Sequence, residues 1–207
     1  MSTLVEIIGF AAQGVGLTFF SVLPGLFEPK KDQTSVIKLV LGSTLGDLSS
    51  SLSGNVPGVA LWDARGRSIG TTPGTSEILG EGNFVNIQVV ANSEVGNIRP
   101  SYISISNGGD DAICVAGFTI TFPDDTRAAW NGDVAAACGA QTFESVTEFG
   151  EDRHKPRCVW IDRSRSLGLK HQGFGLHIGD FFGNEAHLET CNSNVDIMCK
   201  SGPRFRM

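Results

Sequence analysis

Apolar and polar residues alternate in many short segments of this chain, and turns rich in Gly, Pro, Asn and Asp separate the segments. Within 101–106, for example, Ile103 and Ile105 alternate with Tyr102, Ser104 and Ser106, so one face of an extended segment is more apolar than the other. This period of two residues predicts β-strands. Eight strands are expected, at 35–41, 58–63, 84–91, 102–106, 113–122, 157–161, 173–178 and 186–190.

The turns predict how these strands connect. Residues 107–110 tolerate positive φ, so the strands at 102–106 and 113–122 are expected to form a hairpin. The second of these is longer than a typical strand, and Gly117 in its middle is the expected place for a bulge or bend.

Length and composition favour one domain with two packed sheets. The chain has 207 residues, including 26 Gly, and only 18% of its residues are charged. Many short apolar runs with frequent turns are typical of an all-β fold, and nothing in the middle of the chain resembles a linker. We therefore expect a single antiparallel β-sandwich over 31–207, of the jelly-roll or C2/PLAT-like type.

The first thirty residues have a different pattern. Between Thr3 and Phe27 the only charged residue is Glu6, and the apolar residues fall near helical spacing. This pattern predicts an apolar helical segment packed on the domain. Contact of residues 3–27 with a membrane is the alternative, and the chain would then be a membrane-active effector or toxin. Because no basic residues precede the segment, it is not a clear signal peptide.

Several motifs resemble an uncharacterised family of small, mostly secreted fungal β-proteins. The motifs are NGGDDAICVAGFTITFPDD (107–125), AWNGD (129–133), the pair Cys138–Gly139 and KPRCVWID (155–162). The resemblance implies a secreted β-protein and brings no activity, cofactor or catalytic residue with it. Phe122 departs from the family pattern, which often has Trp there, and the last forty or so residues are particular to this chain.

Five cysteines also suggest an oxidising compartment, and an odd number leaves at least one unpaired within a monomer. Cys114 lies in the most apolar strand and is expected to be a buried free thiol. Cys138 and Cys158 are expected to close a loop of about twenty residues, which removes roughly 3 kcal/mol of chain entropy from the unfolded state. Cys191 and Cys199 are expected to close the tail.

Charge and motif content narrow the classes of function. The net charge of −6 argues against a general nucleic-acid binder. From residue 151 onward nine Lys and Arg face seven Asp and Glu, which indicates either a solvated basic edge or a site for an anionic ligand. The chain has no hydrolase, zinc-protease or nucleotide-binding signature.

Histidines supply the only enzyme hypothesis. His177 and His187 each alternate with apolar neighbours in predicted strands, so both face away from the apolar side. If those strands pair, the two imidazoles and nearby carboxylates such as Asp180 would form an acid–base or metal site that acts on a small metabolite. A histidine in a strand is more often an ordinary surface or core residue.

Two sets of residues suggest ligand binding instead. The first set consists of polar turn residues, namely Asn107, Asp110, Asp111, Asp124 and Asp125. If these turns meet at one end of the sandwich, their side-chain oxygens would hold calcium. The same residue types are also ordinary turn formers. Trp62, Trp130 and Trp160 each lie beside a polar residue, as sugar recognition requires, although tryptophan is also ordinary core content. Trp130, Trp160 and Asp133 are the predicted ligand-binding residues.

The function that we expect is therefore a secreted, non-enzymatic binding module that recognises a carbohydrate or a cell-surface ligand through its turn loops. No cofactor is required by this hypothesis, apart from the calcium alternative. The enzyme and the membrane-active effector described above are its two rivals.

Overall fold

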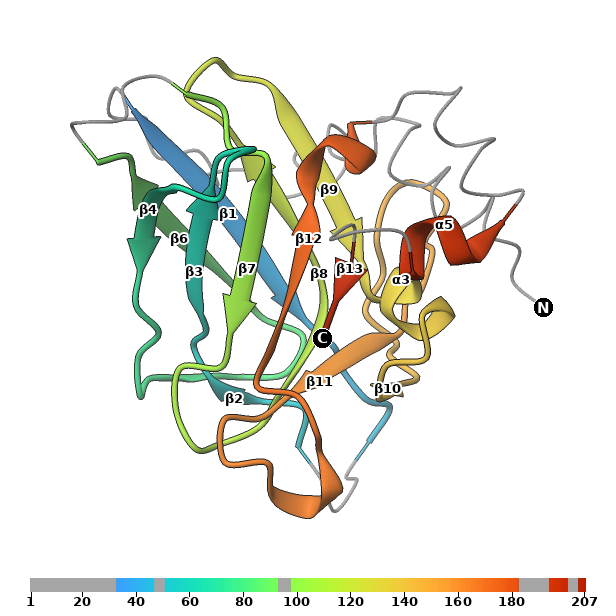
Figure 1. Cartoon of the computed structure of the whole chain (residues 1–207). Helices are drawn as coiled ribbons and strands as arrows, with labels where there is room; N and C mark the ends of the chain where they lie inside the picture. Colours follow the sequence, from blue (N-terminus) through green and yellow to red (C-terminus); the bar gives the residue numbers. More distant parts are fainter. Residues whose placement is uncertain (1–32, 47–50, 93–97, 183–193, 201–204) are drawn as a thin grey trace.

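The computed structural model describes residues 33–46, 51–92, 98–182, 194–200 and 205–207. The predicted N-terminal segment 1–30, its membrane contact and the predicted strand 186–190 all lie outside these residues. In the described part the chain is all-β with antiparallel sheets (Figure 1). The strands are β1 (Thr34–Leu41), β2 (Gly54–Asn55), β3 (Gly58–Trp62), β4 (Ser68–Thr72), β5 (Ile78–Leu79), β6 (Phe84–Val90), β7 (Tyr102–Ser106), β8 (Ile113–Thr121), β9 (Arg127–Asn131), β10 (Thr142–Phe143), β11 (Cys158–Ile161), β12 (Gly173–His177) and β13 (Phe205–Arg206).

Seven of the expected strands fall on described residues, and all seven are present within one residue of their predicted limits. Sequence analysis missed the short strands, notably β4, β9 and β13. It also missed the short helices, which are α3 (Gly132–Ala137), α5 (Val195–Cys199) and the 3-10 helices η1 (Ser166–Gly168) and η2 (Ile178–Phe181).

Two sheets enclose the main core. We call the first sheet A; its strand order is β10-β11-β8-β1-β6, with β9 also paired to β8. The second, sheet C, has the order β13-β12-β7-β3-β4, and β2 pairs only with β5. The inner faces of both sheets contribute to one hydrophobic cluster, which includes Ile37 and Phe118 from sheet A and Leu61, Ile103 and Phe174 from sheet C.

The predicted hairpin between 102–106 and 113–122 is wrong, because its two strands belong to different sheets. β7 pairs with β3 and β12, whereas β8 pairs with β1, β9 and β11. The intervening loop crosses between the sheets, and the Asn107 side chain holds it by donating to the carbonyl oxygens of Asp111 and Ile161 at 2.8 and 3.0 Å.

The predicted irregularity in β8 is confirmed. Val40 pairs with Gly117 and Leu41 pairs with Val115, so Ala116 is an extra residue in β8. A bulge shifts the side-chain alternation by one position. Ile113 and Val115 before the bulge and Phe118, Ile120 and Phe122 after it therefore all face the main core.

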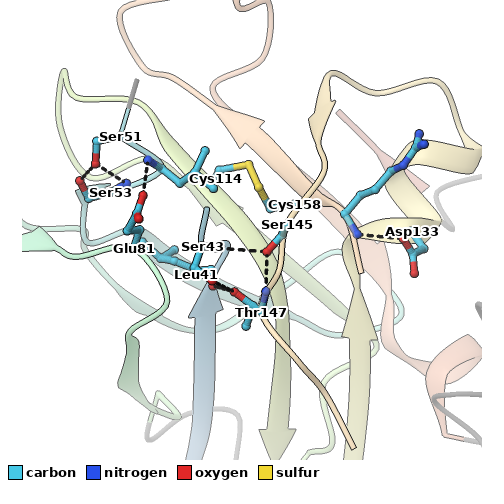
Figure 2. The surroundings of a disulfide bond; sticks show 12 residues. Leu41, Ser43, Ser51, Ser53, Glu81, Cys114, Asp133, Ser145, Thr147 and Cys158 are labelled. Atoms are coloured by element: carbon cyan, nitrogen blue, oxygen red, sulfur yellow. Dashed lines mark hydrogen bonds between the residues drawn. A yellow bond between two sulfur atoms is a disulfide. The ribbon is translucent and has the colours of Figure 1, made fainter. Parts of the chain in front are cut away.

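All three cysteine predictions are wrong, namely the free thiol of Cys114, the Cys138–Cys158 bond and the Cys191–Cys199 bond. Cys114 is bonded to Cys158, and Cys138 is bonded to Cys199; Cys191 lies outside the described residues. Cys114 pairs with Trp160 of the neighbouring strand β11, so Cys158, two residues earlier in β11, lies within bonding reach. The length of the loop between two cysteines does not reveal this strand pairing. Figure 2 shows the Cys114–Cys158 bond beside the hydrogen-bonded loops of Ser43 and Ser145.

Candidate functional site

Trp130 is part of the core and cannot reach a ligand. Its exposed fraction is 3%, and its ring stacks with Phe118, Phe174 and Phe205 at centroid distances of 5.6, 4.7 and 6.2 Å. Trp130 pairs with Phe118 in the ladder, and Phe118 faces inward. The prediction that Trp130 binds a ligand is therefore wrong.

Asp133 is also structural rather than ligand-binding. One carboxylate oxygen accepts from the backbone N–H of Arg157 at 2.9 Å, and the other lies 2.6 Å from Nε2 of His154. Strands β9 and β11 pair with β8 along the same edge, one after the other. Asp133 lies at the start of the segment that connects β9 to β11, and its two partners lie at the end of that segment. The buried carboxylate is thus already bonded, and its predicted ligand role is wrong.

The acidic turns do not meet at one end of the molecule. The turn at 107–111 precedes β8 and the turn at 123–126 follows it, so the whole strand separates them. At the first turn, the Asn107 side-chain oxygen accepts from the N–H of Gly109. At the second, Asp124 accepts from Thr126 and Arg99. The shared calcium site expected from sequence therefore lacks its geometric basis.

The hydrogen bonds at Asp124 have an electrostatic consequence. Its pKa is lowered to about 2, mainly because the Thr126 hydroxyl hydrogen-bonds to the carboxylate, with Arg99 adding to the effect against partial desolvation. Within the described residues no group of three or more His, Cys, Asp and Glu side chains is arranged to hold a metal ion. These residues act as turn formers.

Asp162 is a fully bonded carboxylate that sequence analysis did not select. It is fully buried, and its two oxygens accept from the backbone N–H and the hydroxyl of both Ser164 and Ser166. Burial by itself would raise the pKa of Asp162, but these four hydrogen bonds together lower it. The alternation of Asp162 with Ser164 and Ser166 was the sequence signal for this arrangement. Asp162 holds the loop that follows β11.

Trp160 remains a candidate on the outer face of sheet A. It is partly exposed and packs beside the second hydrophobic cluster, which holds Val40, Cys114, Phe149 and Cys158. Its backbone N–H donates to the carbonyl of Gln141, whose side chain is itself bonded to the 168–170 backbone. No other described aromatic ring forms a stacked or tilted ring pair with Trp160, so it offers at most a single exposed ring.

His177 and Asp180 form the pair that sequence analysis anticipated. Nδ1 of His177 lies 3.0 Å from a carboxylate oxygen of Asp180, whose side chain is only 1% exposed, whereas that of His177 is 35% exposed. The ring of His177 also packs against the ring of Tyr102, at a centroid distance of 5.0 Å and an angle of 48°. His187 lies outside the described residues, so the expected meeting of the two histidines is not tested.

Trp62, Tyr102 and His177 are cross-strand neighbours on three adjacent strands, and we call these three residues the aromatic row. Tyr102 pairs with Trp62 on one side and with His177 on the other. Cross-strand partners point to the same face of a sheet. The neighbours Leu61, Ile103 and Leu176 are buried in the core, so the aromatic row lies on the outer face of sheet C. The alternation of apolar and polar residues within each strand already indicated that these three residues face outward.

Beside the aromatic row the same face carries small residues. Two residues further along the three strands, on the same outer face, lie Ala60, Ser104 and Gly175. Ser104 pairs with Ala60 on one side and with Gly175 on the other. The indole N–H of Trp62 donates to the hydroxyl of Ser104 at 3.3 Å, so the indole leans over β7. In Figure 1 β3, β7 and β12 lie on the side toward the viewer, and no labelled element crosses in front of them. All three rings are partly exposed.

A comparison of the chain with models of known protein families found no match, and a search of curated proteins found no similar sequence.

Proposed function

We propose that this protein is a secreted, non-enzymatic binding module that recognises a carbohydrate or a cell-surface ligand. The outer face of sheet C, rather than the turn loops, is its binding surface. Our proposal also takes the two sheets as a sandwich of the jelly-roll or C2/PLAT-like type, in which a flat sheet face is available for contact.

The single observation that carries the proposal is the aromatic row. Aromatic side chains favour burial, and a folded chain that leaves three aromatic residues partly exposed on adjacent strands forgoes part of that stabilisation. Sugar rings present CH groups that stack on aromatic faces while their hydroxyls bond to nearby polar groups. Adjacent strands are about 4.8 Å apart, so three rings span about 10 Å, the length of about two sugar units.

Secretion is supported by the two disulfides. The Cys114–Cys158 and Cys138–Cys199 disulfides are consistent with an oxidising compartment. Among the described residues no helix is long and apolar enough to cross a membrane. The effector hypothesis based on residues 3–27 stays open beside this proposal, and liposome leakage by the full chain but not by a version starting at Glu28 would favour it.

The enzyme hypothesis has one observation in its favour, the His177–Asp180 hydrogen bond, which resembles the base–orienter pair of many active sites. Within the described residues no serine, threonine or cysteine side chain is bonded to His177, so the pair would act only as a general acid or base. We therefore assign Asp180 the role of holding the His177 ring in the row.

The test compares two tryptophans on opposite faces. Binding of the wild type, Trp62→Ala and Trp160→Ala would be measured on a glycan array, with and without a chelator. We expect Trp62→Ala to lose binding and Trp160→Ala to retain it, because only Trp62 belongs to the aromatic row. Loss through Trp160→Ala alone would move the site to sheet A. Chelator sensitivity would restore the calcium hypothesis, and no binding by the wild type would reject the function.

A further inference from the structure

One glycine beside the aromatic row is not required by the fold. A Cβ placed on Gly175 would lie 3.5 Å from the Ile103 carbonyl oxygen and 3.9 Å from Cβ of Ser104, which are ordinary contacts. Its φ is also outside the left-handed region. Glycine in a strand interior lowers stability by roughly 0.5–1 kcal/mol relative to alanine. Neither packing nor backbone geometry therefore explains glycine at 175.

The other two glycines of this face provide the contrast. A Cβ on Gly58 would lie 2.7 Å from the backbone nitrogen of Gly74, and a Cβ on Gly173 would collide with the carbonyl oxygen of Ile105. Those glycines are needed for close backbone packing. A strand glycine without such a need is typical of a place where a ligand approaches the backbone.

A positive charge lies next to this open position. Arg206 of β13 pairs with Gly175 in the ladder, and Arg206 is exposed while Phe205 beside it is buried. Arg206 therefore lies on the outer face, next to a residue that has no side chain. Arg206 is exposed, and its guanidinium forms no ion pair with another described residue. The guanidinium is planar and matches a carboxylate or sulfate with two parallel hydrogen bonds.

We propose that Gly175 forms the floor of a subsite for an acidic saccharide, whose carboxylate or sulfate is bound by Arg206 while the edge of its ring contacts Tyr102 and His177. This inference rests on the proposed function and names its ligand class. A sugar ring lying over Gly175 has one edge toward Tyr102 and His177 and the other toward Arg206. A side chain at 175 would fill the space that the sugar ring occupies.

The experiment uses polygalacturonate as the acidic probe and its fully methyl-esterified form as the neutral probe. Binding of each by the full chain would be measured by affinity electrophoresis or calorimetry. We expect the wild type to prefer the acidic probe by about tenfold, the scale of one charge-assisted bidentate contact at an exposed site, and the preference to weaken with added salt. Arg206→Gln should remove the preference while leaving the weaker neutral binding in place.

Gly175→Val tests the floor independently. Valine favours strands and its Cβ meets only ordinary contacts, so we expect this variant to fold with unchanged or higher thermal stability and to lose binding of both probes. Gly175→Ala, which adds a single methyl group, should bind with intermediate affinity. Equal binding of both probes with no effect of Arg206→Gln would overturn the acidic subsite while the carbohydrate function stands. Undiminished binding by a folded Gly175→Val would overturn the floor, and binding of neither probe or any arrayed glycan would remove the function itself.

Discussion

The outer faces of the two sheets differ in what covers them. On sheet A, Val40, Cys114, Ala116 and Cys158 are buried, and the ring of Phe149 covers them from the segment between α3 and β11. On sheet C, the aromatic row is partly exposed beside a floor of small residues. The first face buries most of its apolar side chains and exposes the rings of Phe84 and Trp160 in part, whereas the second carries three partly exposed aromatic residues on adjacent strands. Our proposal that the sheet C face binds a ligand rests on these partly exposed aromatic residues and on the small residues beside them.

The largest expected effect comes from removing the disulfide of the covered face. Changing Cys114 and Cys158 to Ala opens a loop with a sequence separation of 44 residues, and chain entropy then predicts a loss of about 4 kcal/mol in the free energy of unfolding. Denaturant titration would measure it. As a control, mild reduction of the native protein followed by alkylation should label Cys138 and Cys199, which are partly exposed, before Cys114 and Cys158, which are fully buried. The reverse order would contradict a sealed sheet A face.

Removing the cover itself should have a similar but smaller effect. Phe149→Ala deletes a buried ring and is expected to lower the free energy of unfolding by about 3 kcal/mol, because a cavity remains over β8. Phe84→Ala on the same face is the matched control. Phe84 is 37% exposed and lies over the Lys38 ammonium at 4.1 Å, so its loss should cost about 1 kcal/mol or less. Equal losses would mean that Phe149 does not seal the face.

Lys38 gives the covered face a pH dependence. Its side chain is buried, and desolvation lowers its pKa from 10.5 to about 8. The unfolded chain then binds more protons than the native state between pH 8 and 10.5, so stability rises as pH increases through this window. From pH 7.5 to 9.5 the gain should be about 2 kcal/mol. Urea titrations at several pH values would measure it, and Lys38→Met should abolish the rise.

The smallest expected effect on stability belongs to the open face. Trp62→Ala removes a partly exposed ring and one hydrogen bond to Ser104, so the free energy of unfolding should fall by about 1 kcal/mol or less. The two substitutions then have different effects, because Phe149→Ala lowers the free energy of unfolding whereas Trp62→Ala lowers ligand binding. A loss of 3 kcal/mol on Trp62→Ala would make this ring structural and remove the contrast.

Sequence analysis predicted the strands well and the site poorly, for physical reasons. Alternation reports which side of a strand is buried, so the inward side of Ile103 and the outward side of His177 were both correct. The same signal placed Tyr102 outward, but its neighbours Trp62 and His177 come from distant parts of the chain. Their meeting depends on the strand order of sheet C, which a local pattern does not contain.

Three errors have the same origin. The disulfide of Cys114 and the burial of Trp130 depend on which strands neighbour β8, and the separation of the acidic turns depends on β7 and β8 lying in different sheets. By contrast, the bulge beside Gly117 was predictable, because strand length and the switch of apolar phase are local properties.

The most direct measurement follows the three indole N–H signals of the chain by NMR during titration with an oligosaccharide that binds on the array or with oligogalacturonate. The chain has three tryptophans, and they lie on the open face, in the core and on the covered face. We predict that the indole signal of Trp62 shifts with saturation while those of Trp130 and Trp160 stay in place. A saturating shift of Trp160 with Trp62 unmoved would contradict the assignment of binding to the outer face of sheet C.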